Sequence, residues 1–347
     1  MCFCHLIIGT QYKLKLFTLY FLAVLASWRF DLICLSSVSS VSSVSKLLKL
    51  IAITALWLAL CRPVAAAEFT FAALGDAPYT RFEETLFPDL LAGMGREELA
   101  FAVHVGDFKA ARASCSDETF LQRRNWFNAA PLPFVFVPGD NEWTDCGGVL
   151  AGGYEPLERL AKLRELFFRG EDSLGRRQIR LERHGPGYPE HARWRHEDVL
   201  FLTLNVPGNA NNARDMPEEF RGRSAAVDQW LEKSFGLARG SRLRAVVIFM
   251  QANPWASPSS RYFGYRGLLA TLAREALAFD GEVLLVHGDT HRYRVDAPLR
   301  DPATGAPVAN FTRVEVFGSP GMNWVRIRVM DAAGRIGFEV TPGNYGQ

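Results

Sequence analysis

The apolar residues of this chain fall into short, nearly continuous runs that alternate with segments of helical spacing. Runs of roughly four to eight apolar residues between turn residues are typical of strands buried on both faces. Such runs cover Phe69–Gly75, Phe101–Gly106, Phe134–Val137, Val199–Asn205, Leu243–Met250 and Glu282–His287. Helical patterns between them are clearest at Glu83–Met94, Leu157–Phe168, Ala225–Phe235 and Gly267–Ala278. The alternation predicts an α/β fold.

The pattern changes towards the end of the chain. Three short apolar segments separated by Gly, Pro and an Asp-Ala-Ala-Gly turn predict an antiparallel meander over Phe311–Val316, Trp324–Val329 and Ile336–Val340. The charged stretch Gly170–Arg195, which contains Gly and Pro, is predicted to run over the surface. We expect a sandwich of β-sheets with flanking helices, in a single domain that spans residues 68–347.

Residues 1–67 have the composition of a leader. Lys46–Ala67 combines two lysines, an apolar core and a small-residue cleavage site, so the mature chain is expected to begin at Glu68. The apolar run Leu16–Trp28 before it indicates a start codon assigned too early, with a signal anchor as the alternative. A lipoprotein modified at Cys61 is a further alternative. We expect an exported protein, periplasmic or extracellular, without a stable membrane partner after signal cleavage.

Removal of the leader changes the charge balance of the protein. The full chain has 39 basic and 37 acidic residues, and residues 68–347 retain 33 basic and 36 acidic ones. A chain with this balance and no basic stripe is not expected to bind nucleic acid.

Four of the apolar runs end in Gly-Asp, and this pair is the strongest chemical signal in the sequence. The carboxylates are Asp76, Asp107, Asp140 and Asp289, and His291 lies two residues beyond the last of them. Because the carboxyl ends of strands meet at one edge of an α/β sheet, we expect these side chains to gather there. Two carboxylates about 4 Å apart repel by roughly 4 kcal/mol at an effective dielectric constant of about 20. The pattern therefore predicts a metal site.

Two cysteines remain outside the leader. Cys115 and Cys146 each follow a Gly-Asp pair within a few residues, so both are expected on loops at the same edge of the sheet. We predict a disulfide between them, which an oxidising compartment would preserve. Two unrelated thiols are the alternative.

The order of the motifs resembles that of the calcineurin-like metallophosphoesterases. The resemblance covers about residues 70–293 and depends on Asp76, Gly106-Asp107, Gly139-Asp140-Asn141-Glu142, Gln251-Ala252-Asn253-Pro254 and Gly288-Asp289-Thr290-His291. It implies two mixed β-sheets packed as a sandwich with flanking helices. It also implies two divalent metal ions at the strand ends.

The family pattern also assigns the metal ligands. They fall on Asp76, Asp107, Asp140, Gln251, Asp289 and His291. Asp107 would bridge the two metals, and Asp76 and His291 would complete the first site. At Gln251 and Asp289 an oxygen donor replaces an imidazole of the family. This exchange favours Mn, Mg or Fe over Zn.

Two departures from the family pattern bear on catalysis. Pro78 stands where the family has a histidine ligand, and Asn141 stands where it has the histidine that protonates the leaving group. An amide does not titrate near neutral pH, so Asn141 is expected to orient a phosphate oxygen. His287 is the nearest candidate for the missing acid, and a strand histidine bonded to backbone is the other interpretation.

Two further residues are predicted to contact substrate. Lys109 lies two residues beyond Asp107, and Asn209 belongs to an Asn-rich loop that follows an apolar run. A solvated lysine and an ordinary Asn-rich turn are the alternatives.

Together these features predict an exported, metal-dependent phosphoesterase that hydrolyses a small phosphomonoester or phosphodiester with metal-activated water. Two other classes stay open. One is a degenerate relative that binds a metal or a phosphorylated ligand without turnover, and the other is a purely structural α/β domain. Metal content separates the structural domain from the first two classes, and turnover of an aryl phosphate separates those two from each other.

Overall fold

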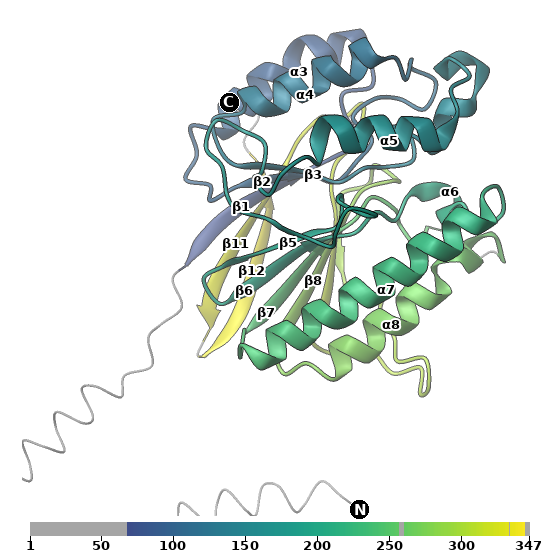
Figure 1. Cartoon of the computed structure of the whole chain (residues 1–347). Coiled ribbons are helices and arrows are strands. Elements are labelled where there is room, and N and C mark those ends of the chain that lie inside the picture. The colour runs from purple at the N-terminus through teal and green to yellow at the C-terminus, as the bar shows by residue number, and fades with distance from the viewer. Residues whose placement is uncertain (1–67, 257–259, 333, 344–347) are drawn as a thin grey trace, which may run out of the picture. The chain divides into compact units, whose positions relative to one another are not determined.

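The computed structural model describes residues 68–256, 260–332 and 334–343. The predicted leader, residues 1–67, lies outside the described residues, so its assignment stays a prediction. Two mixed β-sheets lie at the centre of the described part, and helices cover their outer faces (Figure 1). The predicted sandwich of two mixed sheets with flanking helices is confirmed.

The first sheet has five strands in the order β12-β11-β1-β2-β3. Its strands are β1 (Phe69–Leu74), β2 (Ala102–His104), β3 (Phe134–Phe136), β11 (Val325–Ala332) and β12 (Arg335–Pro342). β1, β2 and β3 run parallel, whereas β11 pairs antiparallel with both β1 and β12. The carboxyl ends of the three parallel strands therefore lie side by side.

The second sheet has seven strands in the order β4-β5-β6-β7-β8-β10-β9. Its strands are β4 (Glu182–Arg183), β5 (Ala192–His196), β6 (Val199–Thr203), β7 (Ala245–Phe249), β8 (Glu282–His287), β9 (Arg294–Asp296) and β10 (Phe311–Glu315). The four strands β6, β7, β8 and β10 run parallel. Every residue of β6 and β7 is buried, which explains their continuous apolar runs.

Helices cover the outer face of each sheet (Figure 1). The first sheet carries α3 (Arg81–Met94), α4 (Asp117–Ala129) and α5 (Pro156–Phe167), and the second carries α7 (Pro217–Gly240) and α8 (Arg266–Leu277). Shorter elements are α6 (Gly208–Asn211) and the 3-10 helices η1 (Thr144–Gly147), η2 (Val149–Ala151) and η3 (Ser260–Tyr265). None of the helices in the described ranges is both long and apolar enough to cross a bilayer.

Aromatic side chains fill the space between the sheets. Phe71 of β1 stacks on Phe101 at 5.2 Å between ring centroids, and both rings contact Phe201 of β6 edge-on, at 5.3 and 4.9 Å. Edge-on and offset pairs of this kind add about 0.5–1.5 kcal/mol each beyond the area they bury. This shared core fixes the two sheets against each other.

Two expectations about the strands were wrong. The stretch predicted to run over the surface contains β4 and β5, and Trp194 of β5 is buried in the core between the sheets. The alternation of Trp194 with arginines is that of a strand with one buried and one more exposed side. The predicted meander does not form either, because β10 pairs in parallel with β8 while β11 and β12 make a hairpin in the first sheet.

Candidate metal centre

The four Gly-Asp pairs follow the carboxyl ends of β1, β2, β3 and β8. The backbone N–H of Asp289 donates to both carboxylate oxygens of Asp76, each at 3.1 Å, and so joins the loops after β8 and β1. The N–H of Asn141 donates to Asp107 Oδ1 at 3.1 Å and joins the loops after β3 and β2. The structure thus brings these loops together at one edge of the sandwich.

The backbone at these strand ends is held in an unusual conformation. Asp76, Asp107, Asp289 and His291 have positive φ angles of 50°, 59°, 83° and 57°. Positive φ is uncommon for residues other than glycine, and such strained conformations cluster at functional sites. All four residues belong to the set that the sequence predicted as metal ligands.

Glycines allow the carboxylates to lie directly against the backbone. A Cβ atom at Gly139 would lie 2.0 Å from Asp107 Oδ1, and one at Gly288 would lie 2.1 Å from Asp76 Oδ2. A Cβ at Gly208 would lie 2.5 Å from Asp140 Oδ2. At Gly139 and Gly288 the glycine of one Gly-Asp pair therefore makes room for the carboxylate of a different pair.

His291 presents one ring nitrogen to Asp76. Its Nδ1 lies 2.8 Å from the carbonyl oxygen of Ser319, and a carbonyl accepts only from an N–H, so Nδ1 carries a proton. Its Nε2 lies 3.6 Å from Asp76 Oδ1. In the neutral ring that Nε2 has a free lone pair. Histidines that bind metals are held in this way, with the other ring nitrogen donating to a carbonyl or carboxylate.

Tyr79 is a residue of the site that the sequence analysis missed. Its hydroxyl donates to Asp107 Oδ2 at 3.2 Å and accepts from Asn141 Nδ2 at 3.0 Å, and its ring packs edge-on against His291. The second hydrogen of the Asn141 amide goes to the carbonyl oxygen of Lys109 at 2.9 Å. Both amide hydrogens are thus used within the protein, and Asn141 positions Tyr79.

Tyr79 could have been found from the helix that follows it. Thr80 caps α3 in a reciprocal arrangement, because its side chain accepts from the N–H of Glu83 and its own N–H donates to the Glu83 carboxylate. The sequence marks the start of this helix with Thr80 as the cap and Glu83 three residues later, shortly after Ala77-Pro78. A tyrosine directly ahead of such a cap, three residues after Asp76, is placed within reach of the strand-end carboxylates.

Gln251 faces Asp107 with its nitrogen. The N–H of Gly208 donates to Gln251 Oε1 at 2.6 Å, and Gln251 Nε2 donates to Asp107 Oδ2 at 3.1 Å. Because a backbone N–H needs an acceptor, the amide oxygen is fixed towards Gly208. The nitrogen, which is not a metal donor, is left towards Asp107.

The carboxylates of the site repel one another in a buried environment. Burial raises the pKa of Asp76, Asp107 and Asp140 well above the ordinary value, and mutual repulsion adds to the effect. Burial also raises the pKa of Asp289 to about 6. These groups bind protons more tightly than free carboxylates because burial and the neighbouring carboxylates both disfavour their ionised forms.

Glu142 is a second residue to which the sequence analysis assigned no role. Its two carboxylate oxygens accept from the backbone N–H groups of Phe108 and Gly139, the latter at 2.9 Å, and its side chain is fully buried. These bonds hold the loops after β2 and β3 in register. The signal was present in the Gly-Asp-Asn-Glu motif, in which Glu142 is the last residue.

Three other predicted residues lie as follows. Lys109 is completely buried, and its Nζ donates to the carbonyl oxygen of Ala110 at 3.2 Å. Asn209 is exposed and its amide donates to Asp215 at 3.1 Å. His287 is completely buried, its Nδ1 bonds the carbonyl of Gly288, and burial lowers its pKa to about 3. A histidine with that pKa is neutral near neutral pH and has no proton to give as an acid.

A disulfide links Cys115 and Cys146, as predicted, with 5.7 Å between the Cα atoms. Cys115 precedes α4 and Cys146 lies in η1, so the bridge joins the loops that follow β2 and β3. Both residues are fully buried, and each sulfur atom lies 3.7 Å from the carbonyl oxygen of Asn141. The bridge therefore fastens the loops that carry Asp107 and Asp140.

The donor set fits a divalent cation by its chemistry. Carboxylate oxygens dominate it, and hard cations such as Mg²⁺, Ca²⁺ and Mn²⁺ prefer oxygen. The distances between these donors, however, are not those of an assembled metal site. Across residues 68–256, 260–332 and 334–343, no three His, Cys, Asp or Glu side chains are placed so that together they hold a metal ion. The carboxylates instead accept hydrogen bonds from protein groups.

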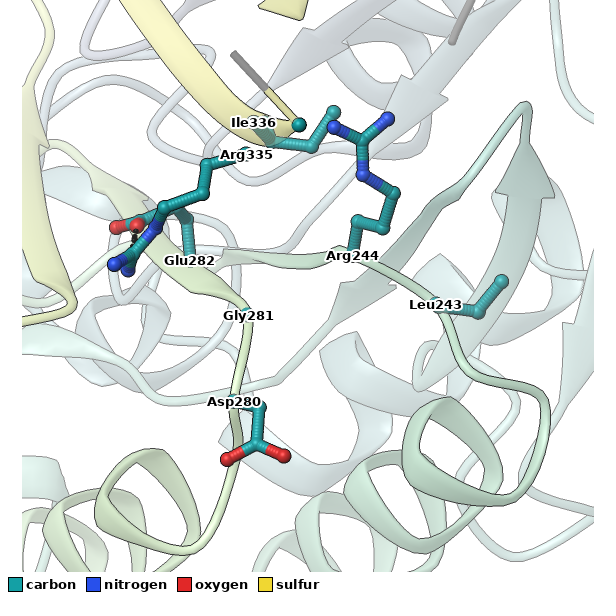
Figure 2. Close-up of a pocket in the computed structure, with 8 residues that line it drawn as sticks. Leu243, Arg244, Asp280, Gly281, Glu282, Arg335 and Ile336 are labelled. Atoms are coloured by element: carbon teal, nitrogen blue, oxygen red, sulfur yellow. Dashed lines mark hydrogen bonds and ion pairs between the residues drawn. The ribbon is translucent and has the colours of Figure 1, made fainter. Parts of the chain in front are cut away.

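A separate hollow of about 140 Å³ lies where β7 and β8 begin, at the opposite ends of those strands from the candidate centre (Figure 2). Its two arginines are paired with carboxylates. Arg335 lies 2.6 Å from Glu282, and Arg244 lies 2.9 Å from Asp331. We therefore place no reaction there.

No family model and no curated protein matches the sequence. Among solved structures, the chain is similar to a dimetal phosphatase from Danio rerio, with 14% identity over 78% of this chain and 98% of that one, and a TM-score of 0.49. It is also similar to the purple acid phosphatase PPD1 from yellow lupin seeds, with 11% identity over 81% of this chain and 52% of that one, and a TM-score of 0.47. A structure of PhoD matches with 13% identity over 81% of this chain and 70% of that one, and a TM-score of 0.47.

Proposed function

We propose that this protein is a metal-dependent phosphoesterase whose cation is held by the carboxylates at the strand ends. The observation that supports this most is the His291 ring, which is fixed by Ser319 so that Nε2 faces Asp76 at 3.6 Å. An imidazole lone pair beside a buried carboxylate is favourable when a cation lies between them. A bound divalent cation supplies Lewis acidity and lowers the pKa of water in the site.

The residues of the chain limit the substrates that this site would hydrolyse well. Asn141 does not titrate, and His287 is buried and neutral, so neither supplies a proton to a leaving oxygen. Substrates whose leaving group has a low pKa need no such proton. We therefore propose aryl phosphates, or diesters with good leaving groups, as better substrates than alkyl phosphates.

Export is part of the proposal. The Cys115–Cys146 disulfide supports it, because disulfides persist in oxidising compartments and are rare in the cytosol. Mass spectrometry of the protein isolated from its native cells tests the cleavage site. A mature chain that begins at Glu68 is expected, and an intact residue 1–67 segment would contradict export by a cleaved signal.

Turnover of 4-nitrophenyl phosphate by metal-free protein, measured with and without added Mn²⁺, tests the function. Activity is expected only with Mn²⁺, and Asp107→Asn is expected to lower it by at least about the 100-fold typical of a disturbed metal site. Asp89→Asn, which removes an exposed carboxylate of α3, is the matched control and should retain full activity. Equal activity on alkyl and aryl phosphates would contradict the proposed lack of a general acid.

One observation favours a second candidate, a protein that binds a metal or a phosphorylated ligand without turnover. Both oxygens of Asp107 already accept hydrogen bonds, from Asn141 on one side and from Gln251 and Tyr79 on the other. A carboxylate so occupied is less free to serve a reaction. Binding of Mn²⁺ without turnover of either aryl monoesters or aryl diesters would establish this candidate.

A further inference from the structure

We propose that a small cavity between α7 and α8 binds a compound that carries one primary ammonium group on a short apolar chain. The cavity has a volume of about 60 Å³, and none of the predicted metal ligands lines it. The inference therefore goes beyond the proposed function and does not depend on it. Its support comes from two unpartnered oxygen atoms, the charge of one of them, and the size and shape of the cavity.

Two side chains of α7 bring unpartnered oxygen atoms to this cavity. Ser224 and Asp228 both line it and are four residues apart, so they lie on the same face of the helix. Ser224 Oγ and Asp228 Oδ1 are buried, and neither has a hydrogen-bond partner among the residues that the structure describes. Buried polar atoms in folded proteins are nearly always hydrogen-bonded. Two such atoms in one cavity therefore indicate a ligand that donates hydrogen bonds.

The Asp228 carboxylate selects the charge of the ligand. Burial raises the pKa of Asp228 above its ordinary value, although a hydrogen bond from Thr271 acts against the rise. Glu232 raises the pKa further, and the nearby Arg274 is in an ion pair with Glu232 at 2.6 Å. A positively charged ligand at Asp228 would stabilise the ionised carboxylate, and an anion would be repelled.

An ammonium group suits these two oxygens better than a metal ion does. A hard cation such as Ca²⁺ takes about six to eight oxygen ligands, and the cavity offers the free oxygens of Ser224 and Asp228. A primary ammonium group carries three N–H donors. Two of them would satisfy the hydroxyl and the carboxylate, which both accept hydrogen bonds.

The rest of the cavity is apolar and limits the size of the ligand. Val206, Phe220, Val227 and Leu268 form its walls. Phe263 lines it as well and is exposed to solvent, so the cavity borders the surface of the protein. One water molecule needs at least about 10–15 Å³ of such space, so the cavity holds roughly four non-hydrogen atoms. An ammonium group on a chain of two or three carbons has that size.

One wall of the cavity is held in place by the protein itself. Residues 209–212 form a left-handed turn with φ angles between 47° and 60°, which residues other than glycine seldom adopt in succession. Arg223 donates to the carbonyl oxygen of Asn211 at 3.1 Å, and Asn211 Nδ2 donates to the carbonyl oxygen of Gly264 at 3.1 Å. Both Asn211 and Gly264 line the cavity. A wall fixed in this way lowers the entropic cost of binding a ligand.

Titration with n-propylammonium chloride tests the inference. Binding is followed at neutral pH by NMR of the backbone amides of the ¹⁵N-labelled protein. Propan-1-ol has the same number of non-hydrogen atoms without the charge and is the matched probe. Saturable shifts are expected at Ser224, Asp228 and Leu268. The Kd for n-propylammonium should be at least about 10-fold lower than that for propan-1-ol, since the ammonium adds a charge-assisted hydrogen bond.

Asp228→Asn keeps the shape of the side chain and removes its charge, so this variant should lose the preference for n-propylammonium over propan-1-ol. Glu218→Gln, at an exposed position of the same helix, is the matched control and should keep the preference. No saturable shift, equal affinity for the two probes in the wild type, or an unchanged preference in the folded Asp228→Asn variant would overturn the inference. If Asp228→Asn fails to fold, the two probes still decide in the wild type. These outcomes leave the proposed function intact, because neither probe nor variant touches the strand-end carboxylates.

Discussion

Replacing Asp289 with asparagine should affect stability differently with and without a divalent cation. In the metal-free protein Asp289 is a buried carboxylate whose pKa is raised from 3.8 to about 6. In the folded protein Asp289 therefore holds its proton more tightly than in the unfolded chain. The free energy of unfolding falls as the pH rises from 3.8 through about 6. The Asn253 N–H that donates to Asp289 Oδ2 at 2.8 Å can still donate to an asparagine oxygen. The substitution thus removes mainly the charge.

The magnitude follows from the pKa. One pKa unit corresponds to about 1.4 kcal/mol, so ionised Asp289 destabilises the metal-free fold by about 3 kcal/mol at neutral pH. Without metal, Asp289→Asn should raise the free energy of unfolding by up to that amount. The difference should vanish below about pH 3.8, where the carboxyl is protonated in both states. Mn²⁺ at about 1,000 times its Kd stabilises the wild type by about 4 kcal/mol, and the variant, which lacks a ligand, gains little.

Urea unfolding followed by tryptophan fluorescence measures both effects, with EDTA in one series and Mn²⁺ in the other. The variant is expected to be the more stable protein in EDTA and the less stable one in Mn²⁺. Asp89→Asn, at an exposed position of α3, is the matched control and should stay within about 0.5 kcal/mol of the wild type in both series. A variant that is less stable in EDTA would refute the claim that burial disfavours the ionised form of Asp289 in the metal-free site.

Three further predictions concern residues that support the site: the disulfide, Gly288 and the cap of α3. Replacing Cys115 and Cys146 by serine should lower the free energy of unfolding by about 3.7 kcal/mol, because the bridge spans a sequence separation of 31 residues; a loss below about 1 kcal/mol in urea unfolding would contradict this. Gly288→Ala should weaken Mn²⁺ binding about 100-fold in calorimetric titration, because its Cβ would lie 2.1 Å from a carboxylate oxygen of the site. Gly93→Ala, where a Cβ meets nothing within 4 Å, is its control, and equal affinities in the two variants would count against the site. Thr80→Ala should destabilise the protein by about 1 kcal/mol through loss of the α3 cap, and unchanged thermal unfolding would contradict the role of the cap.

Local patterns in the sequence were sufficient to predict the strands, the strand ends and the disulfide around the site. The apolar runs predicted the parallel strands, because buried strands have no polar face to interrupt them. The Gly-Asp pairs marked the strand ends, and the spacing of Cys115 and Cys146 after two of those pairs predicted the disulfide. Each of these features depends on a few neighbouring residues, so the sequence carries it directly.

The features that the sequence did not predict depend on contacts between distant segments. The orientation of Gln251 is set by the N–H of Gly208, and no local pattern links these two residues. β10 joins the second sheet because β8 leaves a free edge there, which a pattern of apolar residues does not specify. Tyr79 meets Asp107 only because β1 and β2 are neighbours in the first sheet.

The most direct test of the central claim is a crystal structure of the protein grown with Mn²⁺, with anomalous diffraction data collected at the manganese edge. The account predicts a strong anomalous peak, within about 2.0–2.6 Å of a carboxylate oxygen of Asp76 and close to Nε2 of His291. The absence of a peak at this edge of the sandwich, in crystals that contain Mn²⁺, would contradict it.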